Sequence, residues 1–128
     1  MPNKPVLSPE DKLVIKQKLL QLCEDFWIAQ GYKKTSIKAL CSEAKISIGT
    51  FYVLFATKEQ LFLETAQTIQ SRLTERFKET VHQTPNRMGL SKALKKLARE
   101  FDHNPFLYDV NSVDFRAFVT KLSTEEIE

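Results

Sequence analysis

The chain has 128 residues, of which 42% are hydrophobic, and a formal net charge of +3 at pH 7. It has no run of about 18 apolar residues, which excludes a membrane-spanning helix. Its two cysteines, without a secretory signal, exclude a disulfide framework, and we expect a cytoplasmic protein. The length fits one domain, or one small domain and part of another.

The first predicted helix begins at Ser8-Pro9-Glu10-Asp11, where an N-cap hydroxyl, a proline at the first position and two acids follow one another. Gly31 is expected to end this helix in a left-handed conformation. The helix should brace the two that follow. Its buried stripe should comprise Ile15, Leu19, Leu22, Cys23 and Phe26, with Trp27 on the flank.

Residues 31–58 predict two short helices and the start of a third. Thr35 or Ser36 can cap the first helix and Ser47 the second, because their hydroxyls accept from free N–H groups of the first turn. Thr57, with Gln60 three residues later, predicts the start of the third. Two short helices joined by a three- or four-residue turn form a helix-turn-helix unit, whose second helix can enter a DNA major groove.

The faces of these short helices follow from their spacing. The first should bury Leu40, Cys41 and Ala44, which leaves Lys38, Ser42 and Glu43 outside. The second should bury Phe51 and Phe55, four residues apart. Residues 31–58 hold five lysines against one glutamate, a net charge of +4, so the remaining residues sum to −1. Such an excess is what phosphate neutralisation requires, although a solvated lysine face is the alternative.

Helical periodicity continues to the end of the chain, and no strand-like alternation of any length occurs, so we predict an all-α fold. A long helix should begin at Thr57 or Lys58 and end before Pro85, and two further helices should follow. Residues 122–128 are typical of yet another helix start. The three apolar stripes are Phe62, Ala66, Ile69, Leu73, Phe77 and Val81; Leu90, Leu94, Leu97, Ala98 and Phe101, before Asn104-Pro105; and Phe115, Phe118, Val119 and Leu122, after a cap at Asn111 or Ser112.

One group of motifs resembles the N-terminal domain of the TetR family of transcriptional regulators. The motifs are Gly31-Tyr32, Thr35-Ser36, Ala44 with Ile46-Ser47, Gly49-Thr50-Phe51-Tyr52, Phe55 and Lys58-Glu59. They cover roughly a third of the chain, which is more specific than a lone helix-turn-helix pattern. The resemblance implies a three-helix DNA-binding domain over residues 1–56. It also implies a long fourth helix that leads into a helical effector-binding and dimerisation domain over residues 57–128.

The same resemblance implies a function. We expect a repressor that binds double-stranded DNA at a palindromic operator as a homodimer and is released by a small apolar effector. Regulators of this family have several more helices than the chain provides, and a helix start at residues 122–128 has no use with nothing behind it. We therefore expect the chain to be a fragment, with an incomplete C-terminal domain.

The resemblance also implies which residues contact DNA. The hydroxyls of Thr50 and Tyr52 should hold the DNA backbone, and Lys58, at the start of the long helix, should bind a phosphate. Ser36 and Lys38 should touch the flanking backbone, which sets register rather than sequence preference. Lys45 occupies a turn position where the family usually has glycine, and it adds positive charge. Leu54 stands where relatives often have His or Tyr, which removes a polar contact.

Gly49 is the most informative residue in the second short helix, because glycine in a helix interior lowers helix stability by about 1 kcal/mol relative to alanine. Close approach of the backbone to DNA would explain it, and a helix fixed by tertiary packing is the alternative. No Arg, Asn or Gln lies between Ser47 and Phe55, so we expect Ile48 and Val53 to contact thymine methyl groups and the preferred site to be rich in A·T. The expected DNA-binding residues are Ser36, Lys38, Lys45, Ser47, Ile48, Gly49, Thr50, Tyr52, Val53 and Lys58.

The remaining residues support other functions less well. Cys23 and Cys41 should be inert core thiols. His82 and His103 lack partners at ligand spacing, so we expect no metal, no cofactor and no enzyme. A helical protein-interaction module without DNA binding is the alternative function. An effector pocket, with core packing as the alternative role of its residues, would be lined by Phe77, Leu94, Leu97, Phe101, Phe106, Tyr108 and Phe118.

Overall fold

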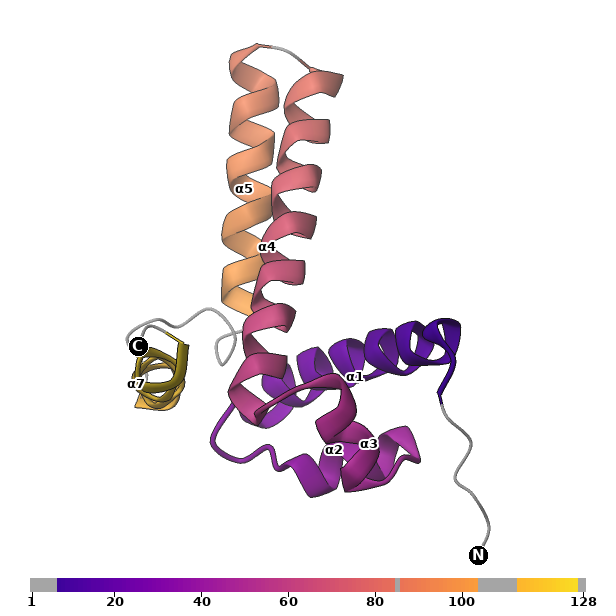
Figure 1. Ribbon diagram of the computed structural model, residues 1–128. Coiled ribbons are helices and arrows are strands. Elements are labelled where there is room, and N and C mark those ends of the chain that lie inside the picture. The colour runs from indigo at the N-terminus through magenta and orange to yellow at the C-terminus, as the bar shows by residue number, and fades with distance from the viewer. Residues whose placement is uncertain (1–6, 85, 104–112, 127–128) are drawn as a thin grey trace, which may run out of the picture.

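The computed structural model describes residues 7–84, 86–103 and 113–126, with the backbone alone at residues 103 and 122–126. Within those ranges the chain forms helices and no strand, which confirms the predicted all-α class. Helices α4 and α5 run side by side as an antiparallel hairpin that stands on a body made by α1, α2 and α3, and α7 lies near the foot of α4 (Figure 1). The helices are α1 (Pro9–Gln30), α2 (Ile37–Ala44), α3 (Ile48–Leu54), α4 (Lys58–Gln83), α5 (Arg87–His103) and α7 (Val113–Glu126).

The predicted helix starts are confirmed by their caps. Each capping hydroxyl accepts a 3.0 Å hydrogen bond from the backbone N–H three residues later, at Ser8, Ser36, Ser47 and Thr57. Thr35, the alternative first cap of α2, is instead buried and donates to the Gly31 carbonyl at 2.8 Å. These bonds satisfy N–H groups that a helix leaves free at its first turn.

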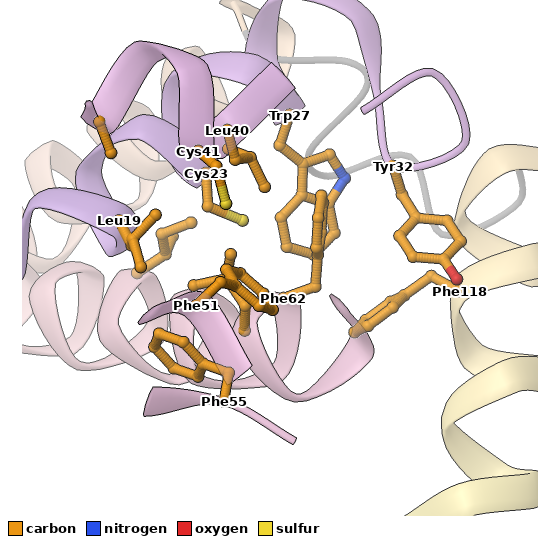
Figure 2. Close-up of a cluster of buried hydrophobic side chains, with 13 residues drawn as sticks. Leu19, Cys23, Trp27, Tyr32, Leu40, Cys41, Phe51, Phe55, Phe62 and Phe118 are labelled. Atoms are coloured by element: carbon orange, nitrogen blue, oxygen red, sulfur yellow. The ribbon is translucent and has the colours of Figure 1, made fainter. Parts of the chain in front are cut away.

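The core lies between α1, α2, α3 and the first half of α4, as Figure 2 shows for its buried side chains. Leu19, Cys23 and Trp27 form the fully buried line of α1, spaced four residues apart. The expectation that Trp27 lies on the flank is therefore wrong. Its indole packs edge-on against Phe62, with ring centroids 4.8 Å apart, and Phe118 of α7 meets it at 5.3 Å. A large flat side chain at that position fills the space between three helices.

The packing of α5 also differs from the prediction. Gly89 and Ala93 are buried against α4, whereas Leu90 and Leu94 are about half exposed. Small residues allow this packing. A Cβ at position 89 would stand 1.6 Å from the Thr84 carbonyl oxygen, so only glycine lets the start of α5 lie so close to the end of α4. Helix α5 therefore turns its smallest residues towards α4 and leaves its leucines on the neighbouring face.

The predicted start of a new helix at residues 122–128 is wrong, because α7 runs through this segment up to residue 126. Residues 113–126 form one continuous helix, so Ser123 lies inside it and does not cap a new one. Extending an existing helix is easier than nucleating a new one, and this outweighs a local start signal. Phe118 of this helix lies in the core of the α1–α3 body, and the domain boundary between residues 56 and 57 stays a prediction. The predicted breaks and caps at Pro85, Asn104-Pro105, Asn111 and Ser112 lie outside the described residues.

Both cysteines should resist modification in the native protein. Burial raises the pKa of the Cys23 thiol from 9.0 to about 12, against a smaller opposing effect of a Thr65 hydrogen bond. Burial also raises the pKa of Cys41. Thiolates are the reactive form, so iodoacetamide at pH 8 should label neither residue until urea unfolds the chain. Since the unfolded Cys23 thiol ionises near pH 9 and the native one only near 12, native stability should hold below pH 9 and fall above it. Rapid labelling of folded protein would contradict this.

Candidate nucleic-acid interface

Helix α3 has one buried side and one exposed side. Phe51 and Phe55 are 0% and 1% exposed and belong to the core. On the other side Ile48, Tyr52 and Val53 are 48%, 52% and 61% exposed. The predicted faces of this helix are thus confirmed, and three large apolar or aromatic side chains face outward together.

Gly49 lies on the same outward side and has open space around it. A Cβ at this position would meet only the Ser47 hydroxyl oxygen, at 3.7 Å, which is ordinary van der Waals contact. Its backbone is not in the left-handed region either. The protein interior therefore places no requirement on glycine here, although the residue weakens a short helix.

The turn before α3 contains a residue in the left-handed conformation. Lys45 has φ 59° and ψ 45°, and the N–H of the next residue, Ile46, donates to the Cys41 carbonyl at 3.0 Å. This is the backbone pattern that glycine usually provides, and a lysine there costs about 1–2 kcal/mol. The side chain is exposed beside the start of α3.

The other predicted DNA-binding residues lie around α3. Ser36, Lys38 and Ser47 are exposed, and Thr50 is half-buried with its hydroxyl 3.0 Å from that of Ser47. Leu40, Cys41 and Ala44 of α2 are buried as predicted, which turns Lys38 to the outside. The structure therefore brings together the exposed side of α3, the start of α2 and the turn that joins these helices.

Lys58, which the resemblance expects to bind a phosphate, contacts the turn after α1 in the structure. Its side chain is half-buried, its Nζ donates to the Tyr32 carbonyl at 2.7 Å, and the ammonium lies 4.0 Å from the centroid of the Tyr32 ring. Burial lowers the pKa of Lys58, and the carboxylates of Glu59 and Asp114 act in the opposite direction. The carbonyl and the aromatic face of Tyr32 together hold the ammonium against the turn after α1.

Tyr32 and Glu59 form a buried contact that the sequence did not predict. The Tyr32 hydroxyl donates to a carboxylate oxygen of Glu59, and each residue is only 7% exposed. The ring also packs against Phe62, with centroids 5.0 Å apart. Both residues belong to motifs that the resemblance identified, but no spacing in the sequence indicates that they pair. The turn after α1 is thereby tied to the start of α4.

The residues expected at an effector pocket separate in the structure. A cavity of about 490 Å³ between α4 and α5 is lined by both Phe77 and Leu97. Phe118 instead fills the core beside Trp27, because α7 packs at the foot of α4. Leu94 and Phe101 do not line the cavity, and Phe106 and Tyr108 lie outside the described residues. The other lining residues are Leu73, Arg76, Glu79, Thr80, Gln83, Ala93, Lys96, Arg99 and Glu100.

Two further observations concern the described part of the chain alone. Over residues 7–84, 86–103 and 113–126, no three His, Cys, Asp or Glu side chains gather where they could hold a metal ion. Over the same ranges, no helix combines the length and the apolar character needed to cross a membrane.

The geometry defines a helix-turn-helix unit: α2, a tight left-handed turn, and α3 with one side buried and the other presented outward. Residues 20–65 match the model of the family described as "Bacterial regulatory proteins, tetR family". This part of the chain, which includes α2 and α3, is therefore similar to the DNA-binding domain of that family.

One curated relative is itself described as a helix-turn-helix transcriptional regulator. The chain is 32% identical over 65 residues to the "HTH-type transcriptional regulator QacR" of Staphylococcus aureus. The match covers 51% of this chain and 35% of the relative, so it spans about a third of the relative's length. No solved structure matches the chain at comparable significance.

Replacing Lys58 by methionine should destabilise the fold. The change keeps most of the aliphatic stem but removes the donor to the Tyr32 carbonyl, so we expect a loss of about 1–2 kcal/mol in the free energy of unfolding. Urea denaturation followed by circular dichroism measures it, and Lys38→Met, at an exposed lysine of α2, is the control. Unchanged stability together with weakened DNA binding would instead assign Lys58 to a phosphate.

Proposed function

We propose that the chain is the DNA-binding part of a transcriptional regulator and that α3 enters the major groove of double-stranded DNA. The observation that carries this proposal is the outward side of α3, with Gly49 in open space in its first turn. A major groove about 12 Å wide admits a helix. A glycine lets the backbone of that helix lie close to the base edges.

Positive charge around α3 supports the same function. Four lysines are exposed: Lys33 and Lys34 before α2, Lys38 in α2, and Lys45 in the turn before α3. Lysines so placed would neutralise phosphates on both sides of the groove, which supplies most of the sequence-independent affinity. The hydroxyls of Ser36, Ser47, Thr50 and Tyr52 would then fix the register of the protein on the DNA backbone.

Sequence preference would come from apolar contacts and DNA shape. Ile48 and Val53 are the exposed aliphatic side chains of α3. The bidentate readers of guanine and adenine are missing from residues 47–55. Thymine methyl groups in the major groove are suited to such side chains, and A·T-rich DNA has a distinctive shape.

The regulator would act as a cytoplasmic repressor, and its two copies would bind a palindromic operator. Two α3 helices in a homodimer would lie about 34–36 Å apart, or a multiple of this, to reach successive half-sites. A small effector would release the DNA, and the cavity between α4 and α5 has the size of a small-molecule site. Its lining mixes leucine and phenylalanine with five charged side chains, so an effector with both apolar and polar groups would suit it.

Replacing Gly49 by alanine should have opposite effects on stability and on DNA binding. The free energy of unfolding should rise by about 0.5–1 kcal/mol, because alanine favours a helix and its Cβ meets no clash inside the protein. Affinity for an operator duplex should fall, since the methyl group holds the backbone away from the bases. Fluorescence anisotropy between 50 and 200 mM salt, roughly the range over which phosphate contacts change affinity steeply, measures the binding.

The same titration tests the function itself. Wild-type affinity should drop steeply with salt, and Gln67→Ala, a neutral change at an exposed residue of α4, should bind as wild type. A chain that bound no duplex at any salt concentration, or an alanine variant that bound as tightly as wild type, would count against α3 as the groove-entering helix.

Selection from random duplexes should return sites with an A·T-rich core. Ile48→Asn should shift the selected sequences, because an asparagine side chain can pair with adenine in the major groove. Sequencing of bound pools after several rounds gives the result. A core dominated by G·C would rule out thymine-methyl readout, and the exposed substitution Val14→Asn on α1 should leave the selected sites unchanged.

A further inference from the structure

The turn between α1 and α2 is held by a carboxylate from the far end of the chain. Asp114, in the first turn of α7, accepts from the backbone N–H of Tyr32 through Oδ2 and from that of Lys33 through Oδ1, both at 2.7 Å. The two partners are 82 and 81 residues away in sequence. Charge-assisted bonds from one carboxylate to two successive N–H groups fix both distance and orientation.

Two other features make this contact specific. Gly31 has φ +87°, and a Cβ there would stand 2.8 Å from Asp114 Oδ2, so the absence of a side chain admits the carboxylate. One helical turn after Asp114, Phe118 packs against Tyr32, with ring centroids 5.3 Å apart, as Figure 2 shows. Helix α7 therefore holds this turn by an apolar contact and an anionic contact together.

Tyr32 is consequently fixed through every polar group that it has. Its N–H donates to Asp114, its carbonyl accepts from Lys58, and its hydroxyl donates to Glu59. The first of these partners belongs to α7 and the other two to α4. The turn thus takes its position from both helices, and it cannot shift without breaking contacts to each.

This turn leads directly into the surface proposed to meet DNA. Lys33 and Lys34 lie on it and are exposed, and Ser36, which caps α2, follows two residues later. A change in the turn would move these three residues relative to α3. We infer that Asp114 is a positioning residue for DNA binding, through which α7 sets the affinity of the helix-turn-helix unit. The inference rests on the proposed DNA-binding function.

Considered alone, electrostatics predicts that replacing Asp114 by a neutral residue would tighten DNA binding. Replacing an acid by its amide makes the protein more positive, which ordinarily tightens binding to phosphates. An asparagine at position 114 offers only one oxygen, so one of the two N–H groups would face an amide NH₂ donor. The positioning role therefore predicts weaker binding in spite of the added charge, and the sign of the change distinguishes the two effects.

The experiment compares Asp114→Asn with Asp102→Asn, which makes the same charge change at an exposed residue of α5. Anisotropy titrations with one operator duplex should show about tenfold weaker binding for Asp114→Asn, as the loss of a charge-assisted hydrogen bond implies. Its salt dependence should be shallower, because fewer lysines would reach phosphates. Asp102→Asn should bind as wild type or slightly more tightly.

A spectroscopic measurement separates positioning from general loss of structure. In ¹H–¹⁵N spectra of the free protein, the Tyr32 and Lys33 amide protons should move upfield in Asp114→Asn, while the amides of α3 keep their shifts. Equal or tighter binding by Asp114→Asn, with wild type binding normally, would overturn this inference alone. Collapse of the whole spectrum would also overturn it, since the residue would then be structural. A wild-type chain that bound no duplex would overturn the proposed function and this inference with it.

Discussion

The burial of Phe51 and Phe55 determines what α3 presents to a partner. A helix of seven residues is not stable in isolation, so its position depends on these two side chains, which pack into the core with Leu19 and Trp27. Burying one such ring contributes about 1.5–3 kcal/mol. That is enough to orient the helix and to keep Ile48, Tyr52 and Val53 on the solvent side, although their exposure is itself unfavourable.

Features that depend on neighbouring residues could be predicted from the sequence. A capping bond spans three residues, so the hydroxyls of Ser8, Ser47 and Thr57 are sufficient to locate the helix starts. The left-handed backbone at Lys45 lies at the position where the resemblance implies that the family usually has glycine. The spacing was also sufficient to predict that Phe51 and Phe55 of the second short helix are buried.

Features that depend on distant partners could not be predicted. Helix α1 carries apolar side chains on several sides, including Leu20 and Ile28, so periodicity alone did not place Trp27 at the centre. A lysine at the start of a helix can bind a phosphate or a carbonyl, and only the position of Tyr32, 26 residues earlier, decides between them. Asp114 has no sequence signal at all, because its partners lie more than 80 residues away.

The outward side of α3 would also fit a protein partner if its apolar side chains were considered alone. Two features favour DNA. Lysines are depleted from protein–protein interfaces, yet exposed lysines lie in α2 and on the segments that lead into α2 and α3. Gly49 contributes no side-chain contact to a protein interface, whereas it suits a backbone that must approach base edges. The turn at Tyr32 is fixed by both α4 and α7. Displacement of either helix by a ligand would therefore change the surface around α3 without any ligand touching it.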